Sequence, residues 1–286
     1  MKVVGKGTKT LYHVLLIFGS IIMLYPFAFA FLGMFMSQEG FYEVSFLPIP
    51  EGFKYCVDNI AKILRRTEIY PSIALTLGRF VWYAFILGFT SVLGGYVFAK
   101  VNFAGKNIAF YLLMSSMMIP GVALLTPQYL MFRKWALVDN PLVLFITGCF
   151  SAYNIFLVRQ TIAGLGDEYK EAAEIDGAGF ITIVFRIYFP MLKPVLAVIL
   201  IQTFIGQWND YLFPDIFMAG NTSWLPIGVL SVRIQSDYMY QVSGGGLVNY
   251  PLAMVMSVFM MIPPVIIYII FQKNFVEGLT AGGVKS

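Results

Sequence analysis

The residues best suited to specific recognition form an acidic segment, residues 167–179, between two apolar runs. Asp167 stands at an N-cap position, and Glu168 and Glu171 place negative charge at the positive end of a helix dipole. Gly177 can adopt the left-handed conformation that ends a helix. The pattern therefore predicts a short charged helix that a soluble partner binds.

One face of this predicted helix is narrow because two of its residues are alanines. Tyr169, Ala172, Ala173 and Asp176 recur at i, i+3, i+4 and i+7. Small side chains let another surface approach closely, so we expect bulky replacements at Ala172, Ala173 or Gly177 to prevent partner coupling and to leave membrane insertion intact. The charged residues alone are also compatible with a solvated loop.

A second helical pattern follows the glycine elbow. Apolar residues recur there at helical spacing: Phe180, Ile183, Val184 and Ile187. Pro190 is expected to break this run before Pro194 opens the next apolar segment.

A second polar constellation, Trp208-Asn209-Asp210, follows an apolar run. A stacking ring, an amide and a carboxylate are the groups that hold a sugar by its apolar face and its hydroxyls. Asn154 is a further candidate for lining a substrate pathway. In the alternative interpretation Asp210 is structural: it pins neighbouring helices or reaches the outer interface.

The composition requires a membrane. Hydrophobic residues make up 59% of the 286 residues and charged residues only 12%, so the chain cannot cover itself with a charged soluble surface. A helix that crosses a hydrocarbon core of about 30 Å needs about 20 mostly apolar residues. The sequence predicts an all-α integral membrane protein that forms one domain, residues 1–286, with six spans at about 11–36, 73–99, 107–130, 141–160, 194–216 and 249–272.

The lysines and arginines predict the orientation. Placing the N-terminus inside puts most of them in the inner loops, as the positive-inside rule requires. Both termini and the loop 166–190 are then cytoplasmic. Arg79 is left near a span end, where it can snorkel to the interface. The first apolar run is too long for a signal peptide and is expected to be a retained helix.

Two further patterns concern packing. In residues 53–65 the apolar residues recur at helical intervals, and the charged residues fall on the opposite side. This pattern predicts an amphipathic helix on the outer membrane surface. Gly88, Gly94 and Gly95 allow close contact between helices, and Pro120 is expected to kink the third span.

The sequence excludes several kinds of chemistry. Cys56 and Cys149 fall at different membrane depths, so no disulfide framework is indicated, and His13 is the only histidine, so no metal site is predicted. The phosphate-binding loop G-x-x-x-x-G-K-[ST] is absent from the sequence. No catalytic residue or cofactor is predicted in this chain, and nucleic acid is not an expected partner. Energy for active transport must enter from another polypeptide, through the acidic segment or through the glycines of the tail, Gly278, Gly282 and Gly283.

Several ordered motifs resemble those of one family. The acidic segment reads Glu171-Ala172-Ala173, three residues, Gly177, and then Ile187-x-x-Pro190. This order is similar to the cytoplasmic coupling loop of permease subunits in binding-protein-dependent ABC importers. Trp208-Asn209-Asp210, residues 225–228 and the tail 278–285 resemble the carbohydrate branch, specifically the second permease of maltose-type systems.

The resemblance implies a role for each matching position. The residues that would couple to an ATPase are Glu168, Glu171, Ala172, Ala173, Asp176, Gly177, Ala178, Gly179 and Pro190. It also implies a carbohydrate cargo, a di- or oligosaccharide, moved by alternating access. The implied partners are a longer homologous permease, two ATPase subunits that hold ATP and Mg²⁺, an extracytoplasmic binding protein and membrane lipid. Residues 244–250 depart from the family pattern, which makes the outer docking surface the least transferable part.

Two rival functions stay open. The first is an ABC permease for another solute, such as a polyol, glycerol phosphate or a peptide. The second is a secondary transporter or channel, which would predict inverted repeats or several buried charges. Only Asp210 stands out as a buried charge in the sequence.

Overall fold

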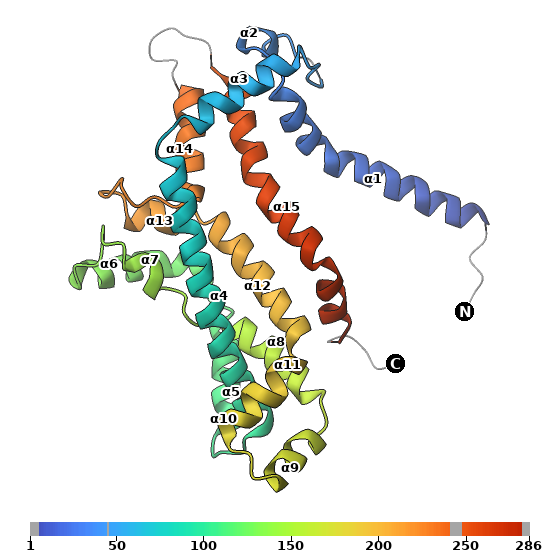
Figure 1. Cartoon of the computed structure of the whole chain (residues 1–286), viewed down its shortest axis with the longest axis vertical. Coiled ribbons are helices and arrows are strands. Elements are labelled where there is room, and N and C mark those ends of the chain that lie inside the picture. Colours follow the sequence, from blue (N-terminus) through green and yellow to red (C-terminus); the bar gives the residue numbers. More distant parts are fainter. Residues whose placement is uncertain (1–5, 45, 241–247, 282–286) are drawn as a thin grey trace. The chain divides into compact units, whose positions relative to one another are not determined.

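The computed structural model describes residues 6–44, 46–240 and 248–281, and helices are the only regular secondary structure in these ranges (Figure 1). The chain divides into two compact units. Unit 1 comprises residues 1–69 and 230–262, and unit 2 comprises residues 70–229 and 263–286. Both polar constellations of the sequence lie in unit 2.

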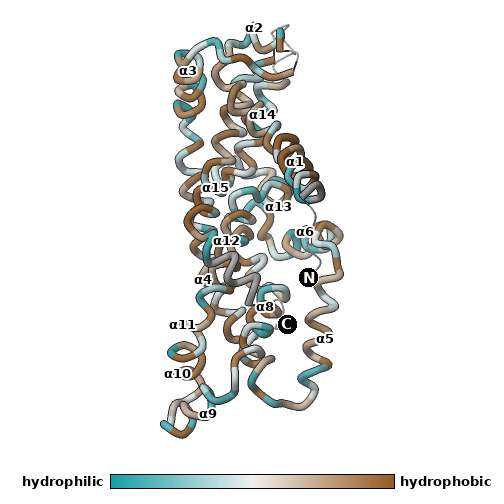
Figure 2. Tube along the Cα trace, turned by 90° about the vertical axis from the view of Figure 1, so that its right-hand side faces the viewer, coloured by the Kyte–Doolittle hydropathy of each residue, from teal (hydrophilic) through white to brown (hydrophobic). Residues whose placement is uncertain are grey.

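Unit 1 begins with the long helix α1 (Lys6–Gly33), and Figure 2 shows hydrophobic residues along most of it. Its apolar side chains face outward, with Met23 75% exposed, as expected of a helix whose solvent is lipid. The short α2 (Gln38–Phe41) follows, capped by the Ser37 hydroxyl, which accepts from the Gly40 amide at 3.0 Å.

The predicted amphipathic helix is confirmed as α3 (Phe53–Leu64). It buries Cys56, Asn59 and Ile63. Asn59 Nδ2 donates to the carbonyl oxygens of Met34 and Met36, both at 3.2 Å, and so satisfies two carbonyls beyond the end of α1. The buried face of α3 therefore carries one amide side chain, which fixes the α1–α2 connection.

The first long helix of unit 2 is α4 (Ile69–Lys100). After it the chain forms α5 (Lys106–Ser116), the 3₁₀ turn η1 (Gly121–Leu124) and α6 (Leu125–Lys134). Gly94 and Gly95 are the points of close helix contact, as predicted: a Cβ at Gly95 would lie 2.5 Å from Val158. Gly88 makes no such contact within the described chain, where an added Cβ would meet no atom within 4 Å.

The fourth predicted span, 141–160, is not one continuous helix. It consists of α7 (Val143–Ile146) and α8 (Ala152–Ala163). Gly148 has φ +75°, which helical residues do not adopt, and the Ser151 hydroxyl accepts from the Asn154 amide at 3.2 Å to start a new helix. The residues between α7 and α8 therefore interrupt the apolar run.

The remaining helices follow in chain order, from the acidic segment to the tail. Its helices are α9 (Glu168–Ile175), α10 (Phe180–Thr182), the π-helix η2 (Ile183–Tyr188), α11 (Phe189–Met191), α12 (Lys193–Trp208), α13 (Leu212–Phe217), α14 (Ile227–Tyr240) and α15 (Tyr250–Ala281).

Three helical segments of the described chain are long and apolar enough to cross a membrane: Lys9–Gly33, Ile69–Lys100 and Tyr250–Lys273. Two bent pairs raise the number to five if each pair is one span. The first pair bends by 91° around Pro120, which confirms the predicted kink, and the second bends by 80° at Leu192. The predicted count of six spans thus stays a prediction.

Candidate functional site

The acidic segment forms the helix α9, as predicted, but Asp167 does not cap it. Its side chain makes no bond to the first turn and instead accepts from Lys100 Nζ at 2.6 Å. Lys100 also donates to the Leu165 carbonyl at 2.7 Å. The hydrogen bond from Lys100 and its positive charge hold the pKa of Asp167 below its usual value. Asp167 therefore anchors the start of α9 to the end of α4.

Gly177 ends α9 as the sequence predicts, with φ +77°. The Ala178 amide donates to the Ala173 carbonyl at 2.9 Å, and the Gly177 amide donates to the Glu174 carbonyl at 3.1 Å. These two bonds form a Schellman motif. Glycine is favoured because a Cβ in this left-handed conformation is strained, although no described atom lies within 4 Å of where that Cβ would stand.

The two alanines of α9 lie in different environments, which corrects the predicted common face. Ala173 is only 6% exposed and belongs to the apolar core of unit 2. Ala172 is exposed, as are Tyr169 and Asp176. Adjacent helix positions are about 100° apart, so two neighbouring alanines cannot both face a partner squarely. A bulky residue at Ala173 would therefore disturb the packing of unit 2 itself.

The structure adds a residue that the sequence analysis missed. Ile175 is 86% exposed, although it is large and apolar. It lies one turn from Ala172 on the side of α9 that faces away from the core. The signal was present in the sequence as an i, i+3 pair of apolar residues among charges. We call the exposed surface formed by Glu168, Tyr169, Ala172, Ile175 and Asp176 the coupling face.

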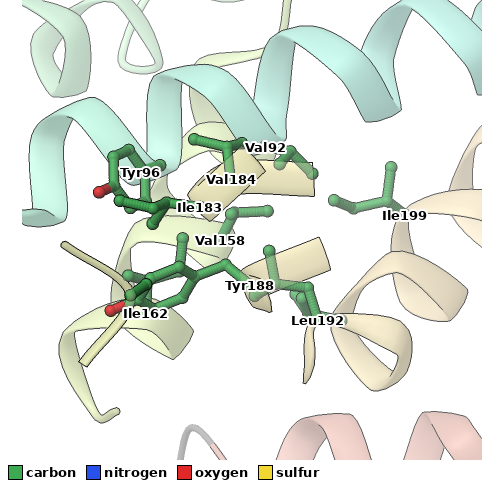
Figure 3. Close-up of a cluster of buried hydrophobic side chains, with 11 residues drawn as sticks. Val92, Tyr96, Val158, Ile162, Ile183, Val184, Tyr188, Leu192 and Ile199 are labelled. Carbon is green, nitrogen blue, oxygen red and sulfur yellow. The ribbon is translucent and has the colours of Figure 1, made fainter. Parts of the chain in front are cut away.

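Behind α9 lies a cluster of buried apolar side chains that joins four helices. Val92 and Tyr96 come from α4, Val158 and Ile162 from α8, Ile183, Val184 and Tyr188 from η2, and Ile199 from α12 (Figure 3). The rings of Tyr96 and Tyr188 lie 5.2 Å apart in an edge arrangement. Since Ala173 packs into this cluster, α9 shares one apolar core with α4, α8, η2 and α12.

Three of the remaining predicted coupling residues lie on α9 or directly after it. Glu171 is exposed on α9, Ala178 is half-buried against the same cluster, and Gly179 is exposed and extended before α10. Pro190 does not break the helical run as expected: it lies at the start of α11, and the bend comes two residues later at Leu192. Proline is tolerated there because the first helical positions need no donor.

Asp210 is paired within the protein. Its Oδ2 accepts from Arg79 Nη2 at 2.6 Å, and Arg79 Nε donates to the Leu144 carbonyl at 3.3 Å. Arg79 is 1% exposed, so the predicted snorkelling of Arg79 is wrong. The missed signal was a pair of opposite charges in two different apolar runs, because such charges are expected to form an ion pair with each other. The structural interpretation of Asp210 is the one that this geometry supports.

The loop before α14 completes this arrangement. Thr76 Oγ1 accepts from the Ile227 amide at 2.9 Å, and a Cβ at Gly228 would lie 2.5 Å from the Asp210 carbonyl oxygen. We call Thr76, Arg79, Asp210, Ile227 and Gly228 the polar node. It joins α4 to the segment after α12 and to the start of α14.

The other residues predicted to line a substrate pathway do not form an open site in the described chain. Trp208 is 3% exposed and stacks on Phe204, with ring centroids 5.7 Å apart. Asn209 is exposed, but its Nδ2 donates to the Ile205 carbonyl of its own helix. Asn154 is buried in α8, and no hydrogen bond in the described chain joins it to Asp210.

The tail is only partly described. Gly278 lies within α15, which continues to Ala281, so the chain is still helical at this glycine. Gly282 and Gly283 lie outside the described residues. Over the part of the chain that the structure covers, no group of histidine, cysteine or carboxylate residues could hold a metal ion.

The comparisons with known proteins agree with this arrangement. Residues 86–281 match the family described as binding-protein-dependent transport system inner membrane component. The chain is 30% identical over 234 residues to the arabinooligosaccharides transport system permease protein AraQ of Halalkalibacterium halodurans, covering 80% of this chain and 79% of the relative. It is 29% identical over 280 residues to the sn-glycerol-3-phosphate transport system permease protein UgpE of Yersinia pestis, covering 96% of each chain.

The fold is also known from a solved structure. A chain of a bacterial ABC transporter involved in the import of the acidic polysaccharide alginate superimposes with a TM-score of 0.81, at 22% identity, over 96% of this chain and 100% of that chain. At this identity the likeness establishes the fold alone.

The chain therefore belongs to the family of inner membrane components of binding-protein-dependent transport systems. It is a permease subunit of an ABC importer in the cytoplasmic membrane, and in this family the ATPase site lies in a separate subunit. Such a system includes an ATPase and a solute-binding protein.

Proposed function

We propose that this chain is one of two permease subunits of an ABC importer that takes up a carbohydrate, a di- or oligosaccharide, by ATP-driven alternating access. The names of the arabinooligosaccharide relatives support this cargo. The sn-glycerol-3-phosphate relatives, which align with nearly the whole chain, support a rival cargo, a phosphorylated polyol. Screening the co-purifying binding protein against both ligand classes separates the two.

The proposed assembly contains a second, longer permease, two ATPase subunits that hold ATP and Mg²⁺, and an extracytoplasmic binding protein. The chain has six spans, with both termini and residues 166–190 on the cytoplasmic side. The distribution of lysines and arginines supports this orientation.

The coupling face of α9 carries the proposal. It places an apolar side chain, Ile175, beside a small one, Ala172, on a helix whose opposite side is packed into unit 2. An ATPase subunit holds this face in a surface cleft. Its closure on ATP pulls α9, and the apolar cluster behind Ala173 passes the movement to α4, α8 and α12. Hydrolysis and release then reset the permease.

The two alanines provide the test, as Ala172→Leu and Ala173→Leu in the reconstituted importer. Ala172→Leu adds bulk only to the coupling face, so we expect unchanged thermal stability and a loss of ligand-stimulated ATPase activity of about tenfold, corresponding to about 1.4 kcal/mol of docking energy. Ala173→Leu overpacks the core, so we expect a lower unfolding temperature from a destabilisation of about 1–3 kcal/mol.

The measurements are stimulated ATPase activity, transport into vesicles and thermal unfolding of each purified complex. Normal stimulation and transport in Ala172→Leu would contradict the assigned coupling face. Gly177→Trp provides a second variant at the end of the same helix. Normal transport by this variant would also contradict the assigned coupling face.

A further inference from the structure

A pocket of about 630 Å³ lies at the junction of α4 and α5 in unit 2. Its polar lining comes from Asn102, Lys106 and Asn107 around the start of α5 and from Arg159 of α8. Figure 1 shows α5 near the end of unit 2 that carries α9 and α10. The pocket is distinct from both the coupling face and the polar node.

The pocket holds two positive charges and its lining contains no carboxylate. Within the described ranges, neither Lys106 nor Arg159 forms an ion pair, whereas nearby Lys100 is paired with Asp167 at 2.6 Å. Among the described residues, Lys106 Nζ donates only to the Ala99 carbonyl oxygen, at 3.3 Å. Two unneutralised cations in one concave site favour an anionic ligand.

Arg159 is held in position while its hydrogen-bonding capacity is unused. Its guanidinium lies over the Phe110 ring, 4.4 Å from the ring centroid. Its Nε is buried and has no hydrogen-bond partner in the described part of the chain. A guanidinium fixed in this way is ready to donate to an anion whose oxygens match its planar geometry, as phosphate oxygens do.

The start of α5 adds to the same field. Gly105, the N-cap residue of α5, has φ +78°, and no side chain of the described residues caps this helix. Because Gly105, Lys106 and Asn107 line the pocket, the positive end of the α5 dipole lies at its lining. An uncapped helix N-terminus with a lysine at its first position attracts phosphate groups.

An apolar strip begins at the pocket and continues along α5. Phe103 and Ile108 line the pocket, and Ile108, Tyr111 and Leu112 are 68%, 71% and 67% exposed. These positions follow one another at helical spacing on one side of α5. A cationic site that continues into an exposed apolar strip matches a phospholipid, whose phosphate and acyl chain are joined in the same order.

We propose that this pocket binds a phosphate-bearing anion, and that its source is the headgroup of an anionic phospholipid whose acyl chain lies along α5. Basic pockets between helices at the membrane surface recognise such headgroups. Lys106 and Arg159 contact the phosphate oxygens, and Ile108 and Leu112 contact the acyl chain. The bound lipid fixes the α4–α5 junction beside the anchor of α9.

The test uses the full chain, purified with its co-purifying subunits from membranes that contain phosphatidylglycerol. The variants are Lys106→Gln and Arg159→Gln. Native mass spectrometry counts the phosphatidylglycerol molecules retained per complex. The same count is made for complexes incorporated into phosphatidylcholine nanodiscs with and without phosphatidylglycerol. We expect each variant to lower the affinity for phosphatidylglycerol about fivefold, as the loss of one cation near a membrane surface implies.

Arg186→Gln is the matched control, because Arg186 is an exposed arginine of η2 that does not line the pocket. Retention that is unchanged in both pocket variants, or that falls equally in Arg186→Gln, overturns the proposal. Inorganic phosphate binding to the lipid-free complex, without enrichment of phosphatidylglycerol, overturns the lipid source. If Arg159→Gln fails to assemble, Lys106→Gln carries the test, with a monodisperse complex as the criterion of folding.

Discussion

Unit 2 concentrates charge in two regions, and the structure stabilises them in opposite ways. The coupling face of α9 leaves its carboxylates in solvent and is supported from behind by apolar packing through Ala173. The polar node buries Arg79 completely and leaves Asp210 only partly exposed, so it depends on hydrogen bonds and an ion pair. The first region is the surface that we propose an ATPase subunit holds. The second suits a fixed joint between helices.

The two regions also differ in the range of the interactions that form them. The helix α9, its glycine end and its Schellman bonds lie within a dozen residues. The polar node joins residues 76–79 to residues 210 and 227–228, far apart in the chain. Removing a charge from the polar node should therefore affect the stability of the whole fold, whereas a substitution on the coupling face should act locally.

The largest effect is expected from Arg79→Met. This change leaves the Asp210 carboxylate without its counter-charge in a low-dielectric site, at a cost of about 3–5 kcal/mol in folding stability. Thermal unfolding of the purified complex, followed by size-exclusion chromatography, measures it. The double variant Arg79→Met with Asp210→Leu should recover part of the loss, because it removes both charges.

An exposed ion pair of unit 1 provides the control for this prediction. Arg66 Nη2 and Asp237 Oδ2 lie 3.1 Å apart, with the two side chains 31% and 54% exposed. Arg66→Met should change stability by no more than about 1 kcal/mol, since solvent screens surface pairs. Equal losses in Arg66→Met and Arg79→Met would show that burial does not distinguish the two pairs.

A smaller effect is expected from Gly95→Ala at the core behind the coupling face. The added Cβ would lie 2.5 Å from Val158 Cγ1 and 2.9 Å from the Arg159 amide nitrogen, so backbone must move. Overpacking of this kind costs about 1–3 kcal/mol and should lower the unfolding temperature. Gly88→Ala, in the same helix with no atom within 4 Å of the new Cβ, should be neutral or slightly stabilising. A loss of the same size in both variants would locate the effect in helix α4 itself rather than in its packing.

The smallest effect is expected from the anchor of α9, and it depends on pH. Lys100 lowers the pKa of Asp167 in the folded chain, so the anchor contributes stability above the unfolded-state pKa of about 3.9. This contribution is lost as the pH falls through the lower folded-state pKa. Asp167→Asn should therefore show a weaker fall in unfolding temperature than the wild type on acidification below about pH 4. Parallel curves for the two proteins would mean that the contact with Lys100 does not contribute.

Much of the coupling region could be predicted because its signals are local. Helix formers, the charge at the first turn and Gly177 specify α9 and its end within a few residues. The amphipathic pattern of α3 and the kink at Pro120 were predictable for the same reason. The role of Asp167 was not, because its partner Lys100 comes from a different helix.

The chain's own sequence determined that it is a helical membrane protein with a charged helix between apolar segments, because composition and helical periodicity are properties of the chain alone. Only the tertiary structure decided which of two neighbouring alanines is available to a partner, where Arg79 finds its counter-charge, and that Trp208 is packed against Phe204 rather than exposed. The reason is physical: periodicity states which residues share a face, but the neighbours that cover that face come from distant parts of the chain.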